Sequence, residues 1–520
     1  MNQRVFHYGK DFLTVSTVLD LARGSKRGVL HHETVQKVQH STEIVSDIVA
    51  AEKVVYGINT GFGPLCNTII SKENTQILQE NILRSHAVGV GNYISKELSK
   101  IMLILKAHSL AQGFSGVSLG LLERIIWHIE NDVVPCVPEQ GSVGASGDLA
   151  PLAHLFLPLI GLGKVWIADI EADPASVLTN HELAPLSLGP KEGLALINGT
   201  QFIAAHATLV VERLYNCLDH ADLIGAMMIE SLMGSIKPFL KQLHQVRPFT
   251  ANLHVAQRIH SMLEDSEILH SHENCDRVQD PYSLRCIPQV HGTSRTAWLH
   301  LKELVETELN AVTDNPVIID EELTISGGNF HGQPLALPLD YAALAASELG
   351  NISDRRIYLA LEGLEGLPKL LMKDTGINSG FMLCQYTSAA LASENKSLVY
   401  PASADSIPTS LGQEDHVSMG SISGRKALKI INNLEKILAI ELLCAAQAFD
   451  FRRPLKSGEV LEAIHATIRK HIDHADQDRV FSADINQALA IITSRELTNM
   501  VSIEKFPQFK TEYYDLYEIY

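Results

Sequence analysis

A glycine-rich loop at residues 141–152, with the sequence GSVGASGDLAPL, holds the residue types needed to build an electrophile from the backbone itself. A loop capped by Asp148 before a helix is the simpler interpretation, but it does not account for the surrounding small residues. For the Gly147 nitrogen to attack the Ala145 carbonyl, two backbone atoms must approach closer than normal contact, which small residues permit best. Loss of water from Ser146 would then leave a methylidene group, an electrophile that no side chain supplies.

Other motifs in the chain do not reach the pattern that their chemistry requires. The GVG sequence at 89–91 lacks the third glycine and the leading strand of a dinucleotide site, and Gly163-Lys164 lacks the hydroxyl residue of a P-loop. The HSHENC stretch at 270–275 matches no spacing of zinc ligands. We therefore assign no metal to the chain.

The elements that must position the loop are mostly helices. Apolar residues recur at three- and four-residue steps in four segments, which predicts helices over 98–112, 203–234, 296–312 and 425–451. The segment 425–451 is apolar nearly all round and belongs inside a bundle. Strand signals are few: a short hairpin over 317–325 and a weaker candidate at 165–170.

This pattern predicts a mainly α fold with few short strands. We expect an N-terminal mixed region at 1–110 that carries active-site loops, followed by a long-helix bundle core with C-terminal helices at 111–520. Polar, glycine-containing loops between the helices are where chemistry concentrates in such a protein.

Composition excludes several classes of protein. The 520 residues include 42 Lys and Arg against 60 Asp and Glu, a net charge of -18 that disfavours nucleic acid as a partner. The start of the chain lacks the apolar core of a secretory signal, and the apolar stretch 149–166 contains prolines and is too short for a membrane span. Seven scattered cysteines without a CxxC pair fit a reducing cytoplasm.

The sequence ASGD at 145–148 resembles the self-cyclising signature of the histidine and aromatic amino acid ammonia-lyases. In that family the Ala-Ser-Gly tripeptide forms 4-methylideneimidazole-5-one (MIO), which here would come from Ala145, Ser146 and Gly147. The similarity continues in VYGINTGFGP (55–64), RSHAVGVG (84–91), EGLALINGTQ (192–201), VQDPYSLRC (278–286), SGGNFHG (326–332) and SIPTSLGQEDHVSMG (406–420). These motifs cover the chain from about residue 50 to residue 420 in the family's order.

The resemblance implies a fold and an assembly as well as a prosthetic group. It implies an elongated, mostly α-helical subunit and a homotetramer built on a central helical bundle. Each active site would be drawn from several subunits. It requires no metal and no diffusible cofactor.

The implied reaction removes ammonia from an α-amino acid and leaves a conjugated acid. The amine is a poor leaving group and the β-proton is barely acidic, so the reaction needs an electrophile and a positioned base. By resemblance, Tyr56 sits over the β-carbon as a candidate base, and Asn198 donates to the ring carbonyl of the electrophile. Gln279 and Tyr282 line the same pocket, where Tyr282 relays a proton to or from the amine, and Phe330 packs beside the ring.

Other matched residues concern the substrate. Arg285 matches the arginine that holds the substrate carboxylate, a task that suits a planar guanidinium. His86, preceded by Ser85, matches the histidine-type selectivity position. Glu414, next to Gln413, can pair with an imidazole N–H or serve as the base, and has no evident partner on a phenyl ring. The resemblance therefore implies conversion of L-histidine to trans-urocanate and ammonia.

Two alternatives stay open from the sequence. Ile287, Gly332-Gln333 and Leu411-Gly412 depart from residues frequent in histidine-specific members, so a tyrosine or phenylalanine ammonia-lyase or an aminomutase of the same family is the first. A helical scaffold without activity is the second. The sequence also leaves open whether Tyr56 or Glu414 takes the β-proton.

Overall fold

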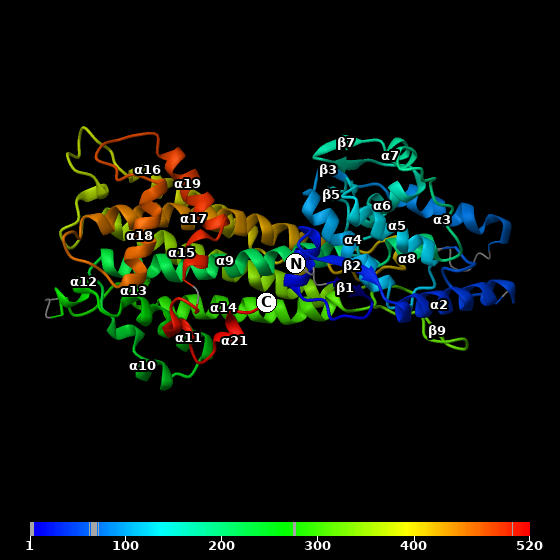
Figure 1. Cartoon of the computed structure of the whole chain (residues 1–520), viewed down its shortest axis with the longest axis horizontal. Coiled ribbons are helices and arrows are strands. Elements are labelled where there is room, and N and C mark those ends of the chain that lie inside the picture. Colours follow the sequence, from blue (N-terminus) through cyan, green and yellow to red (C-terminus); the bar gives the residue numbers. More distant parts are fainter. Residues whose placement is uncertain are drawn as a thin grey trace.

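The computed structural model of the chain describes residues 5–51, 53–61, 63, 70, 72–273, 277–501 and 503–520. Figure 1 shows an elongated molecule in which long helices run along the long axis, and the N-terminal segments gather at one end. The helices up to the centre of the chain are α1 Val15–Ala22, α2 His32–Ala50, α3 Lys72–His86, α4 Lys96–Leu110, α5 Leu119–Glu130, α6 Leu149–Phe156, α7 Pro174–Asn180 and α8 Glu192–Ile197. This architecture confirms the predicted mainly α fold.

The long helices follow in the second part of the chain, together with the C-terminal helices. They are α9 Gln201–Ser231, α10 Lys241–Gln245, α11 Thr250–Leu263, α12 Glu267–His270, α13 Tyr282–Arg285, α14 Ile287–Leu309, α15 Gln333–Leu361, α16 Met382–Leu398, α17 Gly420–Asp450, α18 Glu459–His471, α19 Phe481–Thr493, α20 Glu496–Met500 and α21 Tyr514–Tyr517. The four helices that apolar periodicity predicts are α4, α9, α14 and α17.

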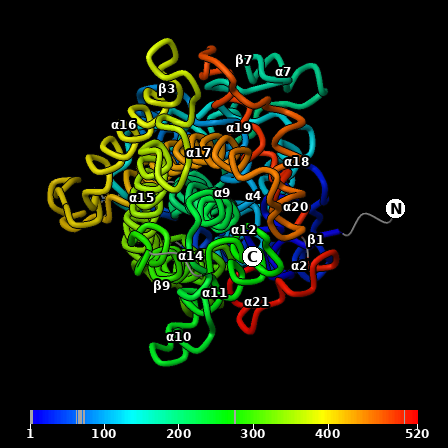
Figure 2. Tube along the Cα trace, turned by 90° about the vertical axis from the view of Figure 1, so that its left-hand side faces the viewer, coloured from blue at the N-terminus to red at the C-terminus, as the bar shows by residue number. Residues whose placement is uncertain are grey.

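Helix α9 is the centre of the bundle. All of its residues except Arg213 and Tyr215 are buried. It packs against α4, α11, α14, α15 and α17, and Figure 2, which looks along the bundle, shows it surrounded by these neighbours. A helix that is buried on all sides belongs in the interior of a bundle.

Helix α17 begins five residues before the start that periodicity predicts, because small residues mediate close packing there. A Cβ on Gly420 would lie 2.8 Å from Ile203, and a Cβ on Gly424 would lie 2.8 Å from His206. Both contacts are with side chains of α9. The glycines that suggest a helix boundary in the sequence therefore allow α17 to approach α9.

The strands are short and lie mostly in the N-terminal half. They are β1 Val5–Tyr8, β2 Arg27–Leu30, β3 Val90–Tyr93, β4 Val134–Pro135, β5 Pro138–Gln140, β6 Val165–Ile167, β7 Ile170–Ala172, β8 Val317–Ile318 and β9 Thr324–Ile325. Strand β1 pairs in parallel with β2, whereas β3–β5, β4–β6–β7 and β8–β9 pair antiparallel. The predicted hairpin at 317–325 is β8–β9, and the weaker candidate at 165–170 is the start of the β6–β7 hairpin.

The apolar stretch 149–166 is divided among short elements. Helix α6 and a 3₁₀ turn over 157–160 bury most of it, and β6 follows after an exposed turn. In the part of the chain that the structure describes, no helix has the length and apolarity that crossing a membrane requires.

A buried cluster of charges joins the C-terminal segment to the bundle. The Glu518 carboxylate lies 3.0 Å from Arg258 and 3.1 Å from Arg295, and its side chain is only 2% exposed. The same two guanidinium groups contact Asp219 and Asp222. These cations hold the pKa of Glu518 well below its usual range.

We expect Glu518→Gln to lower the free energy of unfolding by about 3 kcal/mol, because it removes the buried ion pairs of Glu518 with Arg258 and Arg295. Chemical denaturation of the purified protein would measure this change. The matched control is Glu512→Gln, since Glu512 pairs with Lys241 at 3.2 Å on the surface and both side chains are about half exposed. Glu512→Gln should lower the free energy of unfolding by less than about 1 kcal/mol. Equal changes in the free energy of unfolding for the two variants would contradict a stabilising role of the buried charge cluster.

Candidate active site

A cavity of about 960 Å³ at the N-terminal end of the molecule brings together most of the residues selected from the sequence. Its walls come from α3, α6, α8 and the loops at 56–63, 315–330 and 410–414. The predicted residues that line it are Tyr56, His86, Ser146, Asn198, Phe330, Gln413 and Glu414. Ala145 and Gly147 flank Ser146 in the chain, so nine of the selected residues belong to this region.

The backbone of the loop 144–147 adopts conformations that suit glycine. The φ angles are +76° at Gly144, +51° at Ser146 and +80° at Gly147. A positive φ is unusual for serine and indicates strain held by the surroundings. A Cβ on Gly147 would lie 2.1 Å from the Gly199 oxygen, so no larger residue fits at 147.

Two backbone hydrogen bonds hold this loop against Gly199. The Asp148 N–H donates to the Gly199 oxygen at 2.8 Å, and the Gly199 N–H donates to the Ser146 oxygen at 3.4 Å. The Gly147 nitrogen lies between these two attachment points in the chain. The small residues thus allow the loop to lie directly against the backbone of Gly199, whereas the approach of the Gly147 nitrogen to the Ala145 carbonyl stays a prediction.

Asp148 does not cap the helix that follows it, which corrects the simpler interpretation of the loop. Its side chain makes no hydrogen bond to α6. Its Oδ2 instead accepts from the N–H groups of Phe202 and Ile203, at 3.1 and 3.0 Å, in the first turn of α9. Burial raises the pKa of Asp148 to about 7, although these hydrogen bonds oppose the shift. The carboxylate thus joins the loop to the start of the central helix.

Glu414 faces the hydroxyl of the loop serine. Ser146 Oγ donates to Glu414 Oε1 at 2.7 Å. The other carboxylate oxygen accepts from the hydroxyls of Thr409 and Ser410, at 2.9 and 2.7 Å. Thr409 and Ser410 were not among the residues selected from the sequence, although both lie inside the 406–420 motif. Three hydroxyl donors fix the orientation of this carboxylate.

His86 ends α3 on the wall of the same cavity. Burial lowers its pKa, and the charge of Glu414 opposes that shift. Its Nδ1 lies 3.0 Å from the Ser85 hydroxyl. The His86 imidazole and the Glu414 side chain therefore line the same cavity.

Asn198 lies between α8 and α9 and is 2% exposed. Its Oδ1 has no hydrogen-bond partner among the described residues. A buried amide without a partner is costly and marks a place where another polar group can bind. Since a terminal amide can rotate by half a turn, this position can present either an acceptor or an N–H donor. Such a group fits a carbonyl formed in the neighbouring loop.

Tyr56 lies half-buried at the cavity, where its hydroxyl accepts from the Gly63 N–H at 3.3 Å. Phe62 and Pro64 of the same motif lie outside the described residues. Phe330 lines the cavity from the turn that precedes α15.

Gln279, Tyr282 and Arg285 do not reach this cavity within one chain. They lie on or next to α13, at the opposite end of the molecule (Figure 1). Tyr282 is 73% exposed, and the Arg285 guanidinium lies 4.6 Å above its ring. Arg285 Nε donates to the Asp280 oxygen, and Asp280 in turn accepts from the Ser235 N–H just after α9. One chain therefore carries two separate groups of selected residues.

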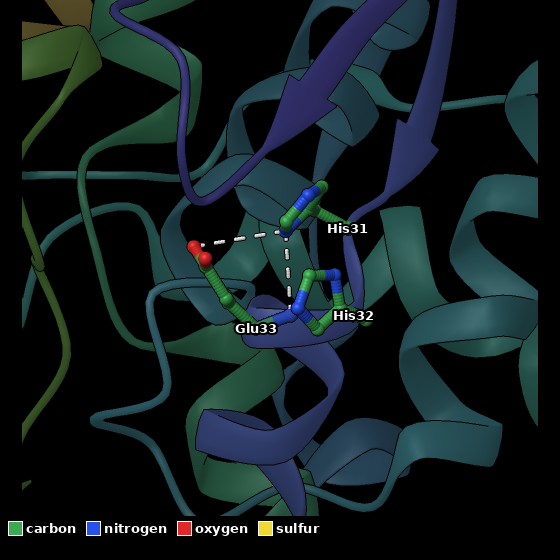
Figure 3. Close-up of side chains that lie close together, drawn as sticks. All are labelled: His31, His32 and Glu33. Carbon is green, nitrogen blue, oxygen red and sulfur yellow. Dashed lines mark hydrogen bonds and ion pairs between the residues drawn. The ribbon is translucent and has the colours of Figure 1, made fainter.

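The described residues contain one group with metal-ligand spacing, His31, His32 and Glu33, shown in Figure 3. Lys10 Nζ already lies 2.9 Å from Glu33 and 3.3 Å from His31. The group also sits at the start of α2, where the helix dipole disfavours a cation. We therefore interpret it as an ion-pair cluster. In the stretch 270–275, both ring nitrogens of His272 contact backbone oxygens, and Cys275 lies outside the described residues.

Comparisons with known proteins show which family the chain resembles over most of its length. The model of the aromatic amino acid lyase family matches residues 13–470. A histidine ammonia-lyase of Natranaerobius thermophilus is 47% identical over 88% of this chain and 91% of its own length. The crystal structure of histidine ammonia-lyase from Trypanosoma cruzi superposes with a TM-score of 0.90 at 38% identity, covering 100% of this chain and 98% of that one. Tyrosine aminomutase from Streptomyces globisporus also has a TM-score of 0.90, at 33% identity, covering 96% and 99%.

Proposed function

Because this chain belongs to the aromatic amino acid lyase family, and is thus a carbon–nitrogen lyase, we propose that it converts L-histidine to trans-urocanate and ammonia. The observation that carries the proposal is the cavity in which His86 and Glu414 face the Ala145–Gly147 loop. An imidazole substrate offers N–H donors that a carboxylate can accept, whereas a phenyl ring offers none. The relatives named histidine ammonia-lyase, 43–47% identical over most of the chain, support the same substrate.

The residues of the loop fit an MIO group formed from Ala145, Ser146 and Gly147. Three observations support this fit: the absence of room beside Gly147, the positive φ of Ser146, and the Asn198 Oδ1 that has no partner among the described residues. The group would supply an electrophile that captures the substrate amine and turns it into a better leaving group. Asn198 would orient that electrophile by a hydrogen bond to its carbonyl.

The other selected residues, from the cavity and from the group around α13, would handle the substrate and its proton. We propose that Tyr56 or Glu414 takes the β-proton, with Tyr282 as relay at the amine. Gln413, His86, Gln279 and Phe330 would form the walls against the substrate. Arg285 would bind its carboxylate through two parallel hydrogen bonds.

A complete site requires a second copy of the chain. No Lys or Arg is among the described residues that line the cavity, yet an amino acid brings a carboxylate that needs a cation. Arg285 is the proposed cation, and it lies at the far end of the same chain. We therefore propose a homotetramer in which each site is drawn from several subunits.

Exposed apolar side chains on the long helices support this assembly. They are Leu337, Tyr341, Leu344 and Tyr358 on α15, and Leu383 and Tyr386 on α16, each at least 42% exposed. Large exposed apolar side chains on neighbouring helices are typical of surfaces that bind another protein chain. The free cysteines at 136, 217, 286, 384 and 444 fit the proposed cytoplasmic location.

An ultraviolet assay of purified protein with L-histidine, L-tyrosine and L-phenylalanine in parallel tests the proposed reaction. Formation of urocanate from histidine alone is the expected result. Release of the conjugated acid from tyrosine or phenylalanine alone would leave the reaction type standing and overturn the assignment of His86 and Glu414. Isomerisation to a β-amino acid would identify an aminomutase instead.

We expect Glu414→Gln to lower kcat/KM for L-histidine by about 10²- to 10⁴-fold, the usual contribution of a positioned acid–base group. The amide keeps the shape of the side chain but removes the charge that faces His86 and Ser146. Steady-state urocanate formation measures the effect. Asp415→Asn is the matched control, because Asp415 is the exposed neighbouring carboxylate and should leave kcat/KM within about twofold. Equal values for both variants would exclude Glu414 from the chemistry.

A further inference from the structure

Lys106 is a buried lysine directly behind the loop that carries Asn198. It lies in α4, where it is 1% exposed. Its Nζ donates to the backbone oxygen of Asn198 at 2.5 Å. Among the described residues, no carboxylate oxygen lies within ion-pair distance of this ammonium group. A buried cation without an ion-pair partner is costly, and such groups are enriched at functional sites.

Lys106 differs from the other buried lysine nearby, because no ion pair of Lys106 is found among the described residues. The neighbouring buried lysine, Lys191, forms its own ion pair with Asp314 at 2.5 Å. The pKa of Lys106 is lowered to about 7, chiefly by burial; Asp314 and Asp148 oppose this shift, and Lys191 adds to it. The direct contact of Lys106 is a single peptide oxygen in the wall of the cavity.

That peptide belongs to the segment against which the Ala145–Gly147 loop lies. Gly199, the next residue, exchanges backbone hydrogen bonds with Ser146 and Asp148, one on each side of Gly147. Gly147 is also the residue that has no room for a Cβ because of the Gly199 oxygen. A change in the orientation of the 198–199 peptide would therefore be transmitted directly to the Gly147 nitrogen.

We propose that Lys106 is a positioning residue for the self-cyclisation of Ala145, Ser146 and Gly147. Its hydrogen bond fixes the 198–199 peptide, and this peptide holds the Gly147 nitrogen beside the Ala145 carbonyl carbon. This inference rests on the proposed function, because it assigns a residue to the formation of the MIO group. It concerns the maturation of the site and not the handling of substrate.

The cyclisation that Lys106 would support needs no co-reactant. A bond forms between the Gly147 nitrogen and the Ala145 carbonyl carbon. The Ala145 oxygen leaves as water with the amide hydrogens of Ser146 and Gly147. Ser146 then loses its hydroxyl and its α-hydrogen as a second water. The mature peptide is therefore lighter than the encoded one by two water molecules, which mass spectrometry detects without any assay of activity.

The decisive experiment measures the mass of the peptide that contains residues 145–147. It compares this mass between the full-length protein without substitution and the full-length Lys106→Met variant. Methionine fills a similar volume but donates no hydrogen bond. We expect the uncyclised fraction to rise by about tenfold or more, a typical loss when reacting groups are no longer oriented. Thermal unfolding should be unchanged or shifted upward, because the variant removes an unpaired buried charge. A purely structural lysine would give the opposite pattern, with lowered stability and complete cyclisation.

Donor-retaining variants make the test independent of folding defects. Lys106→Arg and Lys106→Gln both keep an N–H that can approach the Asn198 oxygen, and we expect both to cyclise more completely than Lys106→Met. Should Lys106→Met not fold, a soluble Lys106→Gln protein with an uncyclised loop would overturn the inference. Complete cyclisation in Lys106→Met would also overturn it. An uncyclised loop in the unmodified protein would instead refute the proposed prosthetic group.

Discussion

Replacing Ser146 with alanine is expected to lower the turnover of L-histidine by about three orders of magnitude or more. The variant has no hydroxyl to lose, so the methylidene carbon cannot form. The side chain of alanine also tolerates the positive φ at 146 no better than serine does, so backbone strain is the same in both proteins. Urocanate formation measured by ultraviolet absorbance gives the rate directly.

Ser142→Ala is the matched control for Ser146→Ala, because Ser142 lies in the same loop. Its hydroxyl donates to Asp148 at 3.3 Å and is not consumed by cyclisation. We expect it to keep most of the activity and the full mass loss of two water molecules. Activity of Ser146→Ala close to that of the unmodified protein would refute the electrophile, whatever the substrate.

Two inactive variants should restore activity when they are assembled together. Ser146→Ala damages the cavity of a chain, whereas Arg285→Ala damages the group at its opposite end. If each site takes Ser146 from one subunit and Arg285 from another, a mixed oligomer contains intact sites. Random assembly of equal amounts would leave about one quarter of the sites intact. Co-expression with two affinity tags, followed by an assay of the doubly tagged fraction, measures the recovery.

A second mixture provides the control for this complementation. Ser146 and Glu414 are hydrogen-bonded within one chain at 2.7 Å, so their variants damage the same cavity. Co-assembly of Ser146→Ala with Glu414→Gln should therefore restore nothing beyond the sum of the parents. Sites shared between subunits would be contradicted if activity recovers equally in both mixtures. They would also be contradicted if activity recovers in neither mixture.

Much of the fold is predictable from the sequence because the long helices bury an apolar surface with helical periodicity. The segments that gave α4 and α9 were located to within a few residues. Apolar periodicity did not predict the first part of α14, which the structure extends back to Ile287. This part contains Ser294 and Arg295, which are polar or charged and yet buried. Arg295 belongs to the charged cluster with Glu518, and such a pairing across 223 residues has no local signature.

The residues of the candidate site were predictable where they belong to sequence motifs. Nine selected residues lie in or beside one cavity, although they come from segments as far apart as 56 and 414. The residues that support them were not predictable. Lys106 lies in a helix like any other lysine, and only the three-dimensional structure places its Nζ against Asn198. The sequence indicates that Asp148 caps the helix directly after it, whereas its carboxylate accepts from the start of α9, more than fifty residues later in the chain.

The length of α9 has a consequence for how such chains can vary. This helix begins beside the cavity and ends next to the segment that holds Arg285, and its 31 residues span about 46 Å. Adding or deleting one residue within it would move one end by about 1.5 Å and rotate it by about 100°. In a symmetric assembly that displacement would recur at every site at once. We therefore expect insertions and deletions among related chains to fall in surface loops, while the number of residues in α9 stays constant.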